Sequence, residues 1–249
     1  MQIHVLTPLG DNFVYVLEAD GRAAVIDPTA AQPVLDLLQR RGLALQQVLL
    51  THHHADHTAG CPALRQATGC AVVGPDDVRL PDLDRAVTGG ATVDVPGAVL
   101  HVLSVPGHTR SHVAYVHRDE PLVFTGDAVF VAGCGRLMEG TADDMWQSMC
   151  RMRELPPATQ LYCGHDYTLE DLEFAAHVLP SCRDIACKLR RVRDLVAAGQ
   201  LTVPSTIAEE RRTNLFMRAD EADVAAAVDA DPASPPAVFA ALRRLKDRW

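Results

Sequence analysis

The 249-residue sequence has no paired-cysteine motif, no hydrophobic run of membrane length and no excess of basic charge. Its seven cysteines are odd in number and irregularly spaced, which favours free thiols and a cytoplasmic location over a disulfide framework. The first residues enter a strand-like alternation without a basic segment or an apolar signal core, so we expect no leader peptide. No apolar run approaches the roughly 20 residues of a membrane span, so we expect no membrane partner.

The formal net charge is −9, and the acidic excess lies within residues 1–170, because residues 171–249 hold equal numbers of acidic and basic side chains. An acidic chain is a poor partner for nucleic acid. We therefore expect no nucleic-acid partner, and if the substrate is an anion, we expect its cationic contacts to come from the C-terminal part. We also expect a monomeric protein, although the charge does not determine this. A content of 48% hydrophobic and 22% charged residues is typical of a globular chain with a real core.

What the sequence does contain is a dense group of metal-binding side chains in the stretch THHHADH, residues 51–57. Imidazole nitrogens and carboxylate oxygens are ligands for zinc, iron and manganese. The stretch follows an apolar run that predicts a short buried strand, so we expect the donors on a strand-end loop. An exposed polar loop or a purification tag is the alternative, and the internal position and the interleaved aspartate argue against it. The four donors are His52, His54, Asp56 and His57.

Three further donors, His108, Asp127 and His165, each follow a short apolar run and a glycine. Glycine lets the backbone turn sharply and approach a site closely. Each residue alone would be read as a cap or a turn, but together with the first group they make seven donors. One ion takes three or four protein ligands, so seven fit two divalent metal ions that share one bridge. The carboxylate of Asp127 is the natural bridge. We expect zinc, with iron or manganese as alternatives.

The pattern of secondary structure changes once along the chain. Strands are predicted at 3–6, 13–18, 23–27, 48–51, 72–73, 99–105, 112–117 and 122–125, with helices at 31–41, 59–68 and 142–154. After Cys163 no strand pattern appears, and helices are predicted at 169–179, 181–198, 221–228 and 236–249, with a shorter one after Pro204 that Ser205 or Thr206 would cap. This predicts layered α/β structure followed by a helical domain.

The motif HxHxDH, the later histidines and Asp127 resemble the metallo-β-lactamase superfamily, and within it glyoxalase II, the hydroxyacylglutathione hydrolases. The resemblance spans essentially the whole chain. It is carried by THHHADHTAG (51–60), VPGHTRSH (105–112), FTGDAVFVAGCGRLMEGT (124–141), CGHDYT (163–168) and the basic tail. It implies a four-layer αββα sandwich at residues 1–168 and a helical substrate-binding domain at 169–249. It also implies hydrolysis of S-D-lactoylglutathione to glutathione and D-lactate, which detoxifies methylglyoxal.

The resemblance assigns roles to particular residues. One metal would be held by His52, His54 and His108, the other by Asp56, His57 and His165, with Asp127 bridging them and Asp56 and Asp127 acting in catalysis. Glutathione contacts would come from Arg136, Leu137, Met138, Tyr167, Arg243 and Lys246. The sequence departs from the family at Leu137 and Met138, which replace an aromatic pair, at Leu215, which replaces a proline, and at Ala59, which replaces a glycine. These departures bear on acyl preference and glutathione affinity.

Three other readings stay open on the sequence. The first is a different enzyme of the same fold, such as a glutathione persulfide dioxygenase, another thioesterase, a lactonase or a β-lactam hydrolase. The second is a metal-buffering or partner-binding module without catalysis, which would not need all seven donors. The third is a flavin-linked diiron oxidoreductase, which would need a flavin domain after the helical tail.

Overall fold

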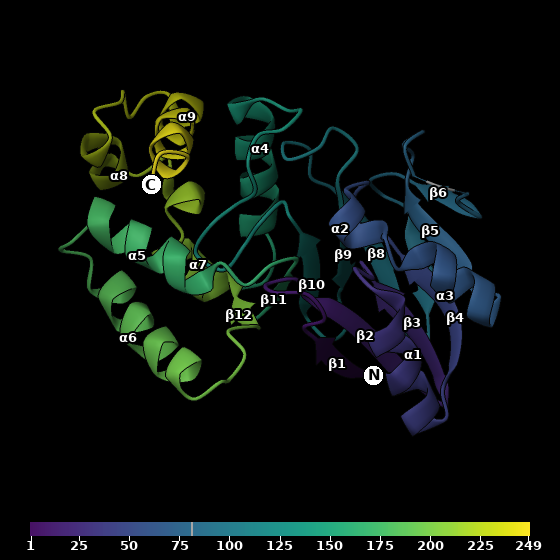
Figure 1. Ribbon diagram of the computed structural model, residues 1–249. Helices are drawn as coiled ribbons and strands as arrows, with labels where there is room; N and C mark the ends of the chain where they lie inside the picture. Colours follow the sequence, from purple (N-terminus) through teal and green to yellow (C-terminus); the bar gives the residue numbers. More distant parts are fainter. Residues whose placement is uncertain (81) are drawn as a thin grey trace.

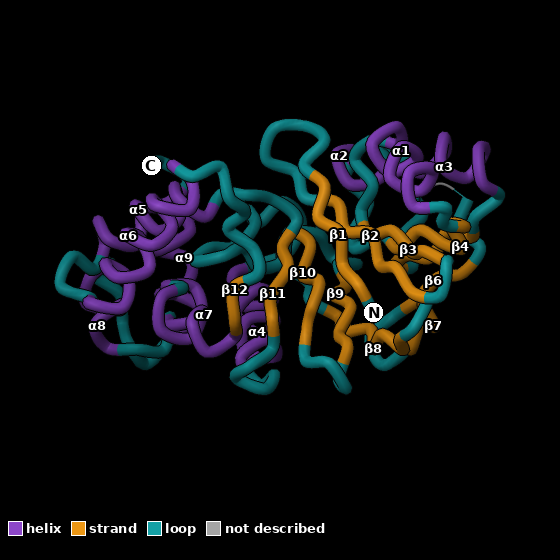
Figure 2. Tube along the Cα trace, turned by 90° about the horizontal axis from the view of Figure 1, so that it is seen from below, coloured by secondary structure: helices purple, strands orange, loops and turns teal. Residues whose placement is uncertain are grey.

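The computed structural model describes residues 1–80 and 82–249, which form two six-stranded sheets and a group of C-terminal helices (Figures 1 and 2). The first sheet has the order β1-β2-β3-β4-β5-β6. Its strands are β1 (Gln2–Leu6), β2 (Val14–Ala19), β3 (Arg22–Ile26), β4 (Ala44–Leu49), β5 (Ala71–Pro75) and β6 (Arg85–Val87). The first three strands are antiparallel, whereas β3 to β6 run parallel, with α1 (Ala31–Arg41) and α3 (Cys61–Thr68) in the crossovers.

The second sheet has the order β12-β11-β10-β9-β8-β7. Its strands are β7 (Thr92–Val95), β8 (Ala98–Ser104), β9 (Val113–His117), β10 (Leu122–Gly126), β11 (Gln160–Cys163) and β12 (Ser205–Thr206). All neighbours are antiparallel except β10 and β11, which are joined through α4 (Ala142–Arg153).

Alternating residues of β2 show how the layers arise. Tyr15 and Leu17 belong to the core that the first sheet shares with the second, whereas Val14 and Val16 face the core formed with α1 and α3. Because successive strand residues point to opposite faces, a strand that is apolar throughout must lie between two layers. The first sheet therefore lies between the helices α1 and α3 on one face and the second sheet on the other. The buried methionines of α4 pack against the core that the two sheets share.

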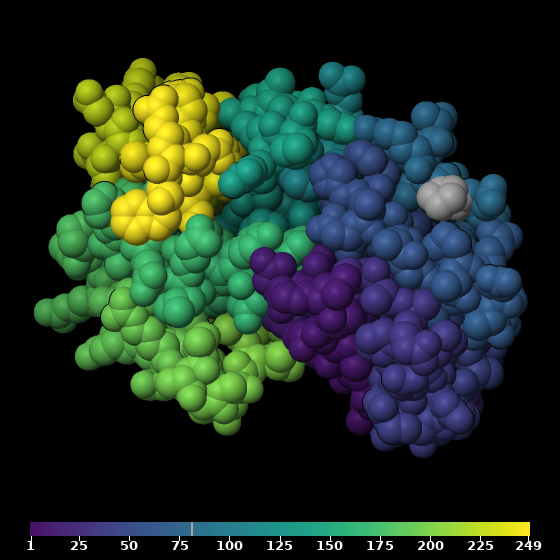
Figure 3. All heavy atoms as spheres, in the orientation of Figure 1, coloured from purple at the N-terminus to yellow at the C-terminus, as the bar shows by residue number. Residues whose placement is uncertain are grey.

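The C-terminal helices gather beyond β12, at the end of the second sheet (Figure 2). They are α5 (Thr168–Val178), α6 (Arg183–Ala197), α7 (Ile207–Thr213), the 3-10 helix η1 (Leu215–Arg218), α8 (Ala222–Ala227) and α9 (Pro235–Lys246). The space-filling view shows the C-terminal segment lying against the segment that contains α4 (Figure 3). Helices α4 and α9 are in contact. The predicted fold class, an αββα sandwich with a helical C-terminal part, is confirmed.

Several predicted elements differ from the structure in detail. A strand does occur after Cys163, because β12 pairs with β11, and the expectation that none would follow was wrong. Two residues are too few to leave an alternating pattern in the sequence. The short strands β6 and β7, with many exposed side chains, were not predicted. Thr206 caps α7 by accepting a hydrogen bond from the amide of Glu209, as one of the two predicted caps. No helix in the described residues is long and apolar enough to span a membrane.

Candidate metal centre

The structure brings all seven predicted donors together at one end of the two sheets. His52 and His54 lie in the loop after β4, and three further donors, His108, Asp127 and His165, follow β8, β10 and β11. Asp56 and His57 lie on α2 (Ala55–Thr58), a single helical turn, and not on the strand-end loop that the sequence suggested. The helical turn places adjacent residues at different angles around its axis, so that Asp56 stays half exposed while His57 is buried.

The predicted donors form two groups of three within this end of the molecule, and Asp27 forms a third with His52 and His57. In the first, Nδ1 of His54 lies 3.1 Å from Nε2 of His52 and 2.9 Å from Nε2 of His108. In the second, Nε2 of His165 lies 3.2 Å from Nε2 of His57 and 3.2 Å from Oδ2 of Asp56. Both groups have the three-ligand size that a metal ion with open positions requires.

Asp127 lies between the two groups. Its Oδ1 is 3.3 Å from Nε2 of His57, and its Oδ2 is 3.6 Å from Nε2 of His108 and 3.5 Å from Nε2 of His165. The carboxylate is buried, and its Oδ1 makes no hydrogen bond. A buried carboxylate oxygen without a partner is costly unless a cation or a donor meets it.

The protonation preferences of the first group of donors suit a metal, whereas the neighbouring carboxylates raise the pKa values of His57 and His165. Burial lowers the pKa values of His52, His54 and His108, so these rings are neutral and each offers a nitrogen lone pair. Burial would raise the pKa of Asp127, but the neighbouring His57 outweighs it and keeps the carboxyl ionised. Neutral ring nitrogens about 3 Å apart cannot satisfy one another without a proton or a cation between them. The donor set therefore fits divalent metal ions.

Three residues that the sequence analysis did not single out hold these ligands in place. Buried Asp27, directly after β3, accepts hydrogen bonds from the amide (2.8 Å) and hydroxyl (2.6 Å) of Thr51, and its Oδ2 lies 3.1 Å from Nδ1 of His57. Asp11 lies 3.2 Å from Nδ1 of His165, and the amide of Asn12 lies 3.4 Å from its Nε2. Such outer contacts fix ring orientation. The signal for Asp27, an aspartate at a strand end, is the one that identified Asp127.

Close packing requires glycine at the positions before the ligands, as Gly164 and Gly126 show. At Gly164 an added Cβ would collide with Asp127 and His57. At Gly126 the backbone has φ of +48°, and an added Cβ would collide with Thr51 and His112. The ring of His112, which the sequence suggested as an orienting residue, stacks on His52 at 4.7 Å, and its Nε2 accepts a 3.2 Å hydrogen bond from the amide of Asp127. The turns into the site are therefore fixed by neighbours on several sides.

A cavity of about 330 Å³ opens beside the two groups of donors. Five of the predicted substrate-binding residues line it, and the sixth, Leu137, packs against the core instead. Tyr167 stacks on His165 with parallel rings 5.0 Å apart. The lining residues are His108, Asp127, Phe130, Cys134, Gly135, Arg136, Met138, Tyr167, Glu170, Asp171, Arg243 and Lys246.

The cavity joins metal-binding side chains to cations from the last helix. The side chains of Arg243 and Lys246 on α9 are each 7% exposed, and they lie over the rings of Phe216 and Phe174. Arg243 also donates a 2.9 Å hydrogen bond to the carbonyl of Cys134. Buried cations at the wall of a cavity are suited to an anionic ligand.

Comparison with known proteins agrees with this architecture. A family model described as the metallo-beta-lactamase superfamily matches residues 7–165. The fold and the histidine-aspartate site thus define a protein of the metallo-beta-lactamase superfamily. A second family model, described as hydroxyacylglutathione hydrolase C-terminus, matches residues 166–249.

Full-length relatives narrow the assignment. The hydroxyacylglutathione hydrolase of Rhodopseudomonas palustris (strain BisA53) is 43% identical, with 99% of this chain and 98% of the relative covered. The hydroxyacylglutathione hydrolase of Rhodospirillum rubrum is 41% identical, with 100% and 99% covered. The chain belongs to the hydroxyacylglutathione hydrolase family. Among solved structures, ETHE1 from Myxococcus xanthus is similar, with a TM-score of 0.65, 31% identity, and 86% of this chain and 83% of that chain covered.

Proposed function

We propose that this protein is a metal-dependent thioester hydrolase that cleaves S-D-lactoylglutathione to glutathione and D-lactate, the hydrolytic step of methylglyoxal detoxification. The observation that carries the proposal is the position of Asp127. It lies between two complete groups of donors and on the wall of a cavity that also presents Arg243 and Lys246. Family membership over the full length of the chain supports the same reaction.

The residues divide into two proposed metal sites. His52, His54 and His108 would hold one ion, Asp56, His57 and His165 the other, and Asp127 would be shared. We propose zinc, with iron or manganese as alternatives, because histidine and aspartate accept all three. When bound, divalent cations make water a stronger acid and polarise a carbonyl group.

The protein's own carboxylates have distinct tasks. Asp27 and Asp11 orient the rings of His57 and His165 through Nδ1. The side chain of Asp56 is 49% exposed, so it can orient an attacking water beside the cluster. The leaving group is a thiolate, which departs without a proton from a general acid. The reaction therefore needs no acid among the residues of the cavity.

Substrate recognition is proposed for the side chains around the cavity. Arg136, Arg243 and Lys246 would donate charge-assisted hydrogen bonds to glutathione carboxylates, and Tyr167 and Met138 would bound the cavity. Leu137 supports this wall from the core side. We also propose residues 1–168 as the catalytic domain and residues 169–249 as the helical domain that supplies Arg243 and Lys246. All seven cysteines are free, which supports a reducing compartment such as the cytoplasm, and we propose a monomer.

The test is hydrolysis of S-D-lactoylglutathione by purified protein before chelation, after chelation, and after readdition of Zn²⁺, Fe²⁺ or Mn²⁺. We expect turnover that chelation removes and metal restores. The same samples are assayed for oxygen uptake with glutathione persulfide. Oxygen uptake without thioester hydrolysis in a metal-loaded sample would contradict the proposal and favour a dioxygenase of the same fold.

A further inference from the structure

A buried acidic side chain, Asp171 of α5, stands beside the cations of the cavity. It is 4% exposed and lines the same cavity as Arg243 and Lys246. Its Oδ1 lies 3.2 Å from Nζ of Lys246. Its Oδ2 makes no hydrogen bond and faces Gly133, where an added Cβ would collide with it. The substrate-facing wall therefore contains a fixed negative charge as well as positive ones.

Each cation that would bind a glutathione carboxylate already has an acidic partner. Lys246 contacts Glu170 at 2.6 Å as well as Asp171, and Nε of Arg243 contacts Oδ1 of Asp247 at 3.0 Å. The side chains of Glu170 and Asp247 are 63% and 43% exposed, so an arriving carboxylate can displace them into water at little cost. Asp171 is only 4% exposed and its carboxylate lies against Gly133 and Lys246, so it cannot move into water in the same way.

We propose that Asp171 is a specificity-determining residue: its immobile carboxylate competes with the carboxylate of the substrate for Lys246 and so limits the preference of the cavity for anionic thiols. The inference rests on the proposed function for the identity of the ligand. Burial raises the pKa of Asp171 to about 6, while Lys246 and Arg243 act in the opposite direction, so the side chain is ionised under mildly alkaline assay conditions. Removal of its charge leaves Lys246 free to pair with the ligand.

The experiment uses Asp171→Asn, which keeps the shape and removes the charge, in the full-length metal-loaded enzyme at pH 7.5. Binding of S-methylglutathione, a thioether that cannot be hydrolysed, is measured by calorimetry beside the KM for S-D-lactoylglutathione. We expect the dissociation constant and the KM both to fall by about three- to tenfold, because Lys246 then pairs with the ligand carboxylate without a competing buried anion. The turnover number should change little, since Asp171 is not a metal ligand in the proposal.

Three controls make the result specific. Glu170→Gln removes the exposed partner of the same lysine, and we expect less than a twofold change. The diethyl ester of S-methylglutathione carries no carboxylate, and its affinity should be the same in the parent protein and in Asp171→Asn. In a Lys246→Met background, Asp171→Asn should no longer change the affinity for S-methylglutathione. This background also provides a second comparison if Asp171→Asn alone folds poorly.

An unchanged or weaker affinity of Asp171→Asn for S-methylglutathione would overturn the inference, since the carboxylate would then be neutral to binding or would itself contact the ligand. An equal gain in affinity for S-methylglutathione and for its diethyl ester would also overturn the inference. Tighter binding of the thioether by Asp171→Asn, in a protein that hydrolyses no glutathione thioester, would support the inference and contradict the proposed function. Absence of measurable binding in both proteins counts against the inference.

Discussion

Two buried polar clusters of the molecule differ in a way that indicates which of them has a chemical role. The histidine cluster holds the seven proposed metal ligands. The lysine cluster holds Lys188 of α6 with Ser205, Glu210, Thr213 and Asn214. Both are formed by side chains that are costly to bury. Only the histidine cluster leaves a polar atom, Oδ1 of Asp127, without a hydrogen bond among the described residues of the two clusters.

The lysine cluster is satisfied by its own members. Nζ of Lys188 donates to Ser205 at 3.0 Å, to Thr213 at 3.3 Å and to Oε1 of Glu210. The second oxygen of Glu210 accepts from the amide of Ala132 at 2.7 Å and from Asn214 at 3.1 Å. A network in which every polar group is paired rigidifies a fold and requires no ligand.

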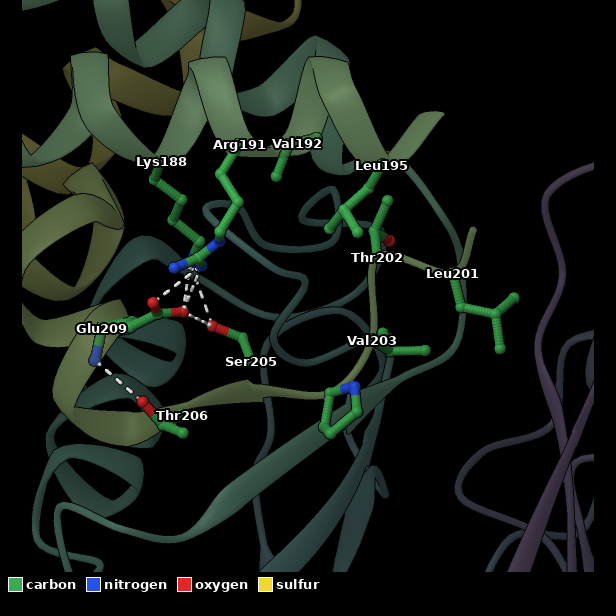
Figure 4. A pocket seen from close by; sticks show the side chains of 11 residues that line it. Lys188, Arg191, Val192, Leu195, Leu201, Thr202, Val203, Ser205, Thr206 and Glu209 are labelled. Atoms are coloured by element: carbon green, nitrogen blue, oxygen red, sulfur yellow. Dashed lines mark hydrogen bonds and ion pairs between the residues drawn. The ribbon is translucent and has the colours of Figure 1, made fainter. Parts of the chain in front are cut away.

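The charged side chains around the pocket next to this cluster are also paired with one another. Figure 4 shows Lys188 and Arg191 pointing from α6 toward Glu209 and Ser205 across a cavity of about 310 Å³. Arg191 and Glu209 form an ion pair at 2.7 Å, so the charges at this surface neutralise each other. Through Ala132, the lysine cluster instead anchors the loop that follows Asp127. Its role is to hold the helices against the catalytic end of the sheets.

The largest expected effect comes from Asp127→Ala, which removes the proposed ligand that the two groups of the histidine cluster share. Loss of an outer partner of a metal ligand already costs roughly 10–100-fold in affinity or activity. We therefore expect more than about a hundredfold loss of thioester hydrolysis and reduced metal content at both sites. Metal analysis and steady-state kinetics measure this, with Asp119→Ala, an exposed carboxylate in a turn, as the control. Full activity with two ions retained would show that the cluster does not depend on a bridge.

The next largest effect is a loss of stability when the lysine cluster is broken. Lys188→Met leaves the carboxylate of Glu210 buried without a cation, and removal of one partner of a buried ion pair costs about 3–5 kcal/mol. We expect a loss of that size in the free energy of unfolding in urea. Folded protein should keep its metal content, because no ligand of the histidine cluster is touched.

Two controls test that interpretation of the lysine cluster. Arg190→Met changes an exposed cation on the same helix and should alter stability by less than about 0.5 kcal/mol. The double variant Lys188→Met/Glu210→Gln removes both charges and should be more stable than Lys188→Met alone. A change below about 1 kcal/mol for Lys188→Met would mean that the network does not anchor the fold.

The contrast also explains what the sequence could predict. Each of the seven donors carries a local signal, because it follows an apolar run or lies in HxHxDH, and strand ends at one edge of a sandwich converge. Asp27 carries the same strand-end signal, yet its contact with His57 spans 30 residues of chain and cannot be read from the neighbourhood of either. The pairing of β12 with β11 likewise depends on segments about 45 residues apart. Leu137 turns to the core while its neighbours Arg136 and Met138 face the cavity, a choice set by packing alone.

The smallest expected effect is at Arg243 of α9, whose side chain lines the cavity and lies over the ring of Phe216. Arg243→Ala should raise the KM for S-D-lactoylglutathione about tenfold and leave the turnover number nearly unchanged, because one charge-assisted hydrogen bond contributes roughly 1.5–3 kcal/mol and acts on binding. Arg244→Ala changes the exposed neighbour on α9 and should leave KM unaltered. Arg243 also donates to the carbonyl of Cys134, so thermal unfolding must be followed alongside the kinetics. A lower turnover number with an unchanged KM would indicate that Arg243 has a structural role, like the lysine cluster, and does not bind the substrate.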